Sequence, residues 1–185
     1  MDSVAKHGMK IQFNEETLRF AFQRENGVLW KWDESYRPYM ECKSGKIYFS
    51  DARQISHKNF QSGVGDGVLS TYCGFENQGE TVPYEFQTLV WMEKTTQDIY
   101  CEWIPICEEG LEVEKVFWPG PMEFREARDD WYTLLNNRQG MLIPNTWETE
   151  LERPVFDGFF GTAGAYMPWF SQVKERNGYL AICVP

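Results

Sequence analysis

The sequence predicts an all-β protein, a large sandwich of two antiparallel sheets. Three observations lead to this class: apolar residues recur with a period of two, turn residues punctuate the chain every 8–12 residues or so, and no stretch of ten residues carries a helical stripe. The chain has 185 residues, of which 42% are hydrophobic and 16% aromatic, so it is long and apolar enough to bury a core. We expect one β-sandwich domain over residues 1–185, with about ten strands.

The N-terminal part predicts a hairpin and several short strands. Residues 17–23 place Leu18, Phe20 and Phe22 on one face, and the Glu25-Asn26-Gly27 turn leads into a second strand at 27–32. Further extended segments are expected at 46–50, 53–56 and 68–75. Residues 63–67 are glycine-rich and read as a turn, and residues 1–10 as a frayed terminus.

The middle of the chain has the clearest pattern. Segments 84–92, 97–106 and 111–118 predict three consecutive strands of an antiparallel meander with one wet face. Glu102, Glu112 and Glu114 are expected on that solvent face. Towards the C-terminus, strands are expected at 131–135, 140–143 and 179–184, with short helical turns at 123–130 and 169–176.

The net charge narrows the partners. The chain has 18 Lys and Arg residues against 28 Asp and Glu, which gives a formal net charge of −10 at pH 7. A field of this sign repels nucleic-acid phosphates and anionic membranes, and it leaves neutral partners such as sugars and other proteins unpenalised. The apolar runs are too short for a transmembrane helix. We therefore expect carbohydrate or protein partners, and neither nucleic acid nor membrane.

Cysteine and histidine usage predicts neither cofactor nor metal. The five cysteines form no CxxC pair, and there are only two histidines. Residues 1–10 lack a signal-peptide core, which favours a reduced, cytoplasmic setting; a secreted protein whose leader has been removed would look the same.

Catalytic residues are not expected within the chain. His7 and His57 are the only histidines, neither is near a nucleophile elbow, and the 63–67 glycine loop lacks the Lys-Ser/Thr of a phosphate loop. Paired carboxylates could act on a glycosidic bond. Glu148 and Asp157 stand out because their neighbours are aromatic and loop-like, although a structural role is the simpler interpretation for each.

Aromatic loops carry the best functional signal. Segments 145–147, 156–160 and 166–170 combine Trp, Tyr and Phe with Asn and Asp. A sugar ring stacks its C–H face on an aromatic ring while polar groups bind its rim. Covering the core and packing against another domain are the alternatives. These three segments are therefore where a sugar contact is expected.

A family resemblance appears in the same segments. Phe117-Trp118-Pro119-Gly120, then 131–135, 139–144, 165–169 and 177–182, follow an order that resembles the N-terminal β-supersandwich (galactose-mutarotase-like) domain of large bacterial glycoside hydrolases. The likeness is greatest to α-N-acetylgalactosaminidases and endo-α-N-acetylgalactosaminidases.

The resemblance implies a role for the chain. Residues 1–185 would be the non-catalytic N-terminal part of a longer glycoside hydrolase acting on α-linked glycosides. The domain would pack on a downstream (β/α)₈ barrel that supplies the catalytic carboxylates, and its loops would line the glycan site. The resemblance makes Trp147, Asp157, Tyr166 and Trp169 the candidate substrate-binding residues, as loop positions near the matching motifs. Three alternatives stay open: a free-standing carbohydrate-binding module, an aldose 1-epimerase (mutarotase) that uses His57, and a protein-interaction sandwich.

Overall fold

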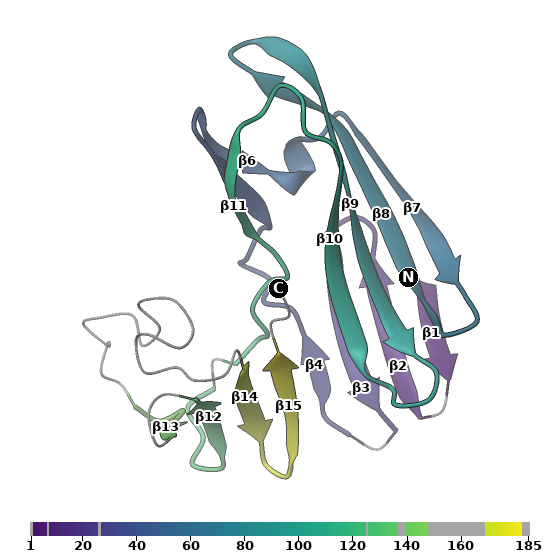
Figure 1. Cartoon of the computed structure of the whole chain (residues 1–185). Helices are drawn as coiled ribbons and strands as arrows, with labels where there is room; N and C mark the ends of the chain where they lie inside the picture. The colour runs from purple at the N-terminus through teal and green to yellow at the C-terminus, as the bar shows by residue number, and fades with distance from the viewer. Residues whose placement is uncertain are drawn as a thin grey trace. The chain divides into compact units, whose positions relative to one another are not determined.

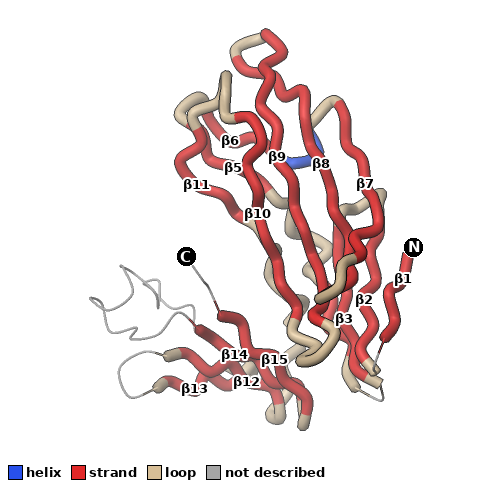
Figure 2. Tube along the Cα trace, turned by 45° about the vertical axis from the view of Figure 1, so that its right-hand side comes forward, coloured by secondary structure: helices blue, strands red, loops and turns tan. Residues whose placement is uncertain are grey.

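The all-β prediction is confirmed. The computed structural model describes residues 2–6, 8–25, 27–124, 126–136, 140–147 and 169–182. Within these ranges, regular structure consists of fifteen strands and one short 3₁₀ turn, η1, at Phe49–Asp51 (Figure 2). The strands pair antiparallel in four sheets across the described residues.

The chain forms two compact units, residues 1–123 and residues 124–185. The single domain over 1–185 stays a prediction, and each unit is described by itself. The first unit contains the strands β1 Asp2–Lys6, β2 Met9–Asn14, β3 Arg19–Arg24, β4 Leu29–Lys31, β5 Tyr39–Cys42, β6 Gly45–Tyr48, β7 Gln54–Gln61, β8 Gly65–Asn77, β9 Glu80–Glu93, β10 Ile99–Cys107 and β11 Val113–Phe117.

The first unit is a sandwich built on one long sheet. Strands β10-β9-β8-β7 form that sheet, and the two smaller sheets, β1-β2-β3-β4 and β11-β5-β6, lie against different ends of it (Figure 1). The Phe13 ring in β2 contacts His57 in β7, at 4.9 Å between centroids. Phe49, in the turn that follows β6, packs 4.7 Å from Phe86 in β9. These contacts join the layers around one aromatic core.

Strand register decides which side chains enter that core. Val68 lies opposite Val90, Ser70 opposite Thr88, and Tyr72 opposite Phe86, so alternate residues of β8 and β9 share the inner face. These inner residues are at most 4% exposed. Tyr72 and Phe86 stack at 4.8 Å with 15° between their planes. Large aromatic rings bury much apolar area each, which makes this row a main source of stability.

The predicted three-strand meander is correct for two strands and wrong for the third. β9 and β10 pair as expected, whereas β11 leaves the sheet and pairs with β5. The period-two pattern predicts an extended segment but contains no information on its partner. The Tyr36 hydroxyl, which donates to Phe117 O at 2.7 Å, holds the end of β11 in its place.

Two further expectations for this unit are corrected. Residues 2–6 and 9–14 form a hairpin, β1 and β2, rather than a frayed terminus. Gly65 and Gly67 belong to β8 rather than to a turn, and the connection between β7 and β8 is confined to residues 62–64. A Cβ at Gly65 would overlap the Trp91 indole of β9, and a Cβ at Gly67 would overlap the Val90 carbonyl and the Trp91 Cα. These glycines therefore allow β9 to approach closely instead of bending the chain.

The second unit is one four-stranded sheet. Its order is β13-β12-β14-β15, formed by β12 Trp131–Leu135, β13 Met141–Pro144, β14 Trp169–Lys174 and β15 Asn177–Ile182. The expected helical turn at 169–176 is wrong, because residues 169–174 pair with both β12 and β15. The described part of 123–130 is likewise not helical.

Candidate functional site

Two of the four predicted sugar-contacting residues lie in the described part of the chain, both in the second unit. Trp147 is in the turn after β13, where its N–H donates to Pro144 O at 3.2 Å, and its side chain is 57% exposed. Trp169 is the first residue of β14, half-buried and opposite Ile182 of β15. The other two, Asp157 and Tyr166, lie outside the described residues, as does Glu148.

Hydrogen bonds fix the turn that carries Trp147. The Asn145 N–H donates to Trp131 O at 2.9 Å, and the Asn145 amide donates to the carbonyls of Phe124 (3.3 Å) and Glu126. A side chain that satisfies backbone carbonyls in this way anchors a turn that has no sheet partner of its own. These hydrogen bonds fix the position of the turn that carries Trp147. A residue that stacks on a ligand needs such a fixed backbone.

The sheet next to this turn contains a buried cation. The Lys174 ammonium lies 4.5 Å from the Trp131 ring centroid, and Phe124 stacks on the same indole at 5.4 Å. The Arg128 guanidinium lies 5.8 Å from that ring. Cation–π contacts of this kind compensate part of the cost of removing an ammonium group from water. They make Trp131 a structural support rather than a ligand-facing residue, because it is only 8% exposed.

His57 lies on the inner face of β7. Its Nδ1 is 2.8 Å from Ser70 Oγ, and its ring meets the Phe13 ring edge-on. Burial lowers the pKa of the imidazole below its usual 6.5, and the nearby Glu15 carboxylate opposes this shift. Tyr72 interacts with the same Ser70 and with Thr88, while burial raises the pKa of its phenol. His57 is therefore a half-buried side chain that packs against Phe13 and lies within hydrogen-bond distance of Ser70.

An aromatic row on the outer face of the long sheet was missed by sequence reasoning. Trp91 stacks on Tyr100 at 4.6 Å, contacts Phe60 at 6.3 Å, and donates its indole N–H to Glu102. Tyr100 is 42% exposed. The signal was present in the sequence, because aromatic residues occur at outward positions of β7, β9 and β10. In the sheet, Gly67 of β8 lies between Phe60 and Trp91, and Trp91 lies opposite Tyr100.

The three glutamates predicted on a solvent face are exposed, although Glu112 precedes β11 and Glu114 belongs to a different sheet from Glu102. Glu102, Glu112 and Glu114 are all exposed, and Glu112 pairs with Lys43. Cys42, Cys73, Cys101 and Cys107 are free thiols, and burial raises the pKa of Cys101 to about 12. Such a thiol stays protonated and packs as a small hydrophobe. The cytoplasmic location stays a prediction.

The described residues bear on two binding classes, metal ions and membranes. No group of three or more His, Cys, Asp and Glu side chains in these ranges is arranged to hold a metal ion. None of the helical structure described here has the length and apolar character needed to cross a bilayer.

Comparison with solved structures gives a strong match. The chain is similar to α-N-acetylgalactosaminidase NagBb from Bifidobacterium bifidum, with 36% identity and a TM-score of 0.89 in that enzyme's complexes with Gal-NHAc-DNJ and with GalNAc. Against its ligand-free form, identity is 35% and the TM-score 0.83. No protein-family model and no curated protein matches the chain.

The match covers nearly all of this chain but a minor part of the relative. In both complexes the alignment includes 99% of this chain and 29% of the enzyme. The resemblance predicted from the sequence is therefore confirmed: the chain corresponds to a domain-sized β-sandwich portion of a glycoside hydrolase.

Proposed function

We propose that the chain is the non-catalytic N-terminal β-sandwich domain of a glycoside hydrolase that acts on α-linked glycosides, with α-linked N-acetylgalactosamine as the first substrate to test. The domain packs on a catalytic (β/α)₈ barrel, and its loops line one side of the glycan site. The catalytic acid/base and nucleophile lie in the barrel. The observation that carries this proposal is the 36% identity over 99% of the chain to 29% of an α-N-acetylgalactosaminidase.

The chemistry of the described residues supports a non-catalytic role. His57 is half-buried against Ser70 and Phe13, and the side chains of Glu102, Glu112 and Glu114 are exposed. A general acid for glycoside hydrolysis instead needs a pKa raised by its surroundings, close to a second carboxylate. Trp147 supports the glycan-lining role, because a large exposed indole on an anchored turn suits stacking against a sugar ring.

An activity assay tests the proposal. The purified 185-residue chain is incubated with aryl α-glycosides, including the α-N-acetylgalactosaminide, and the released phenol is measured. We expect no turnover above that of buffer. Hydrolysis that is abolished in Glu148→Gln or Asp157→Asn would overturn the non-catalytic role.

A second candidate function is a free-standing carbohydrate-binding module, which the exposure of Trp147 also favours. The measurement is calorimetric titration of the chain against a panel of α- and β-linked glycans. Binding that is lost in Trp147→Ala but kept in Val64→Ala, where the replaced side chain is 61% exposed and lies in the first unit, would favour the module.

The epimerase alternative has a direct test of its own. Polarimetry of fresh α-galactose or α-glucose in the presence of the chain reports the rate of anomer exchange. We expect the rate to equal that of buffer, since the His57 ring packs against Phe13 instead of facing an open site.

A further inference from the structure

We propose that one face of the second unit's sheet is the surface on which the catalytic part of the same polypeptide packs. We call it the Leu180 face and define it by Tyr132, Leu134, Leu142, Val173, Leu180 and Ile182. This inference rests on the proposed function, because it names the surface through which the accessory domain meets its catalytic partner.

Register places these six residues on one side of the sheet. Leu142, Leu134 and Leu180 lie in one row across four strands, with Ser171 of β14 between the last two. Tyr132 and Val173 form the adjacent row. Ile182 lies two residues beyond Leu180 on β15, opposite the half-buried Trp169 of β14, which shares this face. Side chains directly opposite in antiparallel strands share a face, so the rows form one continuous surface.

The Leu180 face is apolar and open. Leu142 is 53% exposed, Leu180 56% and Ile182 60%. The Ser171 hydroxyl, within the same face, donates to Tyr179 O at 2.7 Å and is thereby satisfied inside the sheet. The described positions of these two rows include no charged side chain, although Asp, Glu, Lys and Arg make up 25% of the chain.

Part of the opposite face of the same sheet is packed, although Met141 on that face is exposed. It carries Trp131, Leu135 and Lys174, which are 6–8% exposed. Within the described residues of the second unit, these side chains are buried, whereas Leu142, Leu180 and Ile182 on the other face are exposed. Contiguous exposed apolar surface rimmed by polar residues marks an interaction site, and depletion of charge is typical of an interface core.

The length of the related enzyme supports the catalytic part of the polypeptide as the partner of the Leu180 face. The matched part is 29% of NagBb, so most of that glycosidase is polypeptide outside the region that this chain resembles. A flat leucine-rich sheet face fits an apolar protein surface. It fits a free sugar poorly, because a sugar needs polar groups around its rim.

Thiol labelling measures whether the face is covered. Leu180→Cys and the control Val64→Cys are made in the 185-residue chain and in the protein encoded by the complete reading frame, and the labelling rate at each position is followed by mass spectrometry. We expect Leu180→Cys to react rapidly in the 185-residue chain and at least about tenfold more slowly in the complete protein. Val64→Cys should react at the same rate in both.

The other outcomes overturn the inference in distinguishable ways. Equal labelling of Leu180→Cys in both proteins refutes the surface, and if the complete protein still hydrolyses the aryl α-glycoside, the proposed function survives. Protection in the 185-residue chain that grows with concentration assigns the face to a second copy. Protection there that is independent of concentration assigns it to another segment of the chain. A reading frame without a catalytic domain refutes both proposals.

Discussion

The two units use the same strand chemistry with different results. In the first unit, the inner face of the long sheet is covered by two smaller sheets, and Phe86 at its centre is fully buried. In the second unit, one face of a single sheet is packed and the Leu180 face is open. The comparison teaches that alternating apolar residues predict an apolar sheet face. They do not identify the segment that packs on that face, which can come from elsewhere in the protein.

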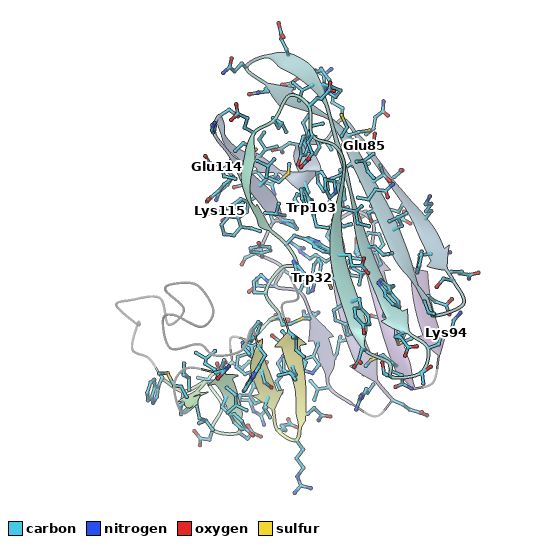
Figure 3. All side chains as sticks on the ribbon, in the orientation of Figure 1. Trp32, Glu85, Lys94, Trp103, Glu114 and Lys115 are labelled. Carbon is cyan, nitrogen blue, oxygen red and sulfur yellow. The ribbon has the colours of Figure 1, made fainter. Side chains whose placement is uncertain are left out.

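The first unit itself contains both outward-facing and inward-facing side chains. Glu114 and Lys115 project outward from β11, whereas Trp103 projects from β10 towards the interior (Figure 3). Trp103 lies 5.8 Å from Phe86, within a group of rings that also includes Phe49, Tyr72 and Phe75. The core of this unit is therefore dense in aromatic side chains, and truncations in it should be costly.

The largest expected effect compares the two units directly. Phe86→Ala removes a ring at the centre of the core and should lower the free energy of unfolding by about 3–5 kcal/mol. Leu180→Ala, at a 56% exposed position in the second unit, should change it by less than about 0.5 kcal/mol. Urea denaturation followed by tryptophan fluorescence measures both. Equal losses would show that the Leu180 face is packed within this chain.

The next effect concerns the glycines of the long sheet. A Cβ at Gly67 would overlap the backbone of Val90 and Trp91, so Gly67→Ala should cost about 3 kcal/mol. Gly63→Ala is the control, because a Cβ there meets no atom within 4 Å. Chemical denaturation of both variants tests the point. A neutral Gly67→Ala would mean that β8 and β9 are less closely paired than described.

A smaller effect is expected in the second unit, where local hydrogen bonds replace a two-sided core. Asn145→Ala removes the amide that donates to the Phe124 and Glu126 carbonyls, and should cost about 1–2 kcal/mol. The exposed Asn59 of β7 offers a matched control in Asn59→Ala. Hydrogen exchange of β12 and β13 amides should accelerate in Asn145→Ala alone; unchanged exchange would contradict the anchoring role.

The smallest effect is a pH dependence confined to the first unit. The pKa of His57 is lowered in the folded chain, so the unfolded chain binds more protons just below pH 6.5. Stability should be complete above that value and fall as the pH drops below it, by at most about 1.4 kcal/mol per pH unit for one proton. Melting temperatures between roughly pH 5.5 and 7.5 measure it. His57→Gln should flatten the curve, and an unchanged slope would refute the assignment.

Strand existence could be predicted from sequence because period two is a local property. Residues 131–135 are a strand with the predicted bounds, and Leu18, Phe20 and Phe22 are all buried. Pairing could not be predicted so well, because the partner of β11 is set by contacts such as Tyr36 to Phe117 that join distant segments.

The errors at 169–176 and in the candidate site have related causes. Trp169–Lys174 shows weak alternation, and only its pairing with β12 and β15 makes it a strand. Of the candidate residues, Trp147 is exposed and Trp169 is half-buried, and the sugar-contacting role of all four stays a prediction. The Trp91–Tyr100 row escaped notice because it depends on two strands lying in register.

The order of strands also bears on how the chain acquires its structure. β7, β8, β9 and β10 are consecutive and each pairs with its neighbour, so this meander can form from local contacts as soon as residues 54–107 are synthesised. β5 must wait for β11, which is made much later. During translation, the edge of β5 that β11 will occupy is available to other chains. Crowding of nascent chains, or slow elongation between β5 and β11, should therefore raise the risk of misassembly.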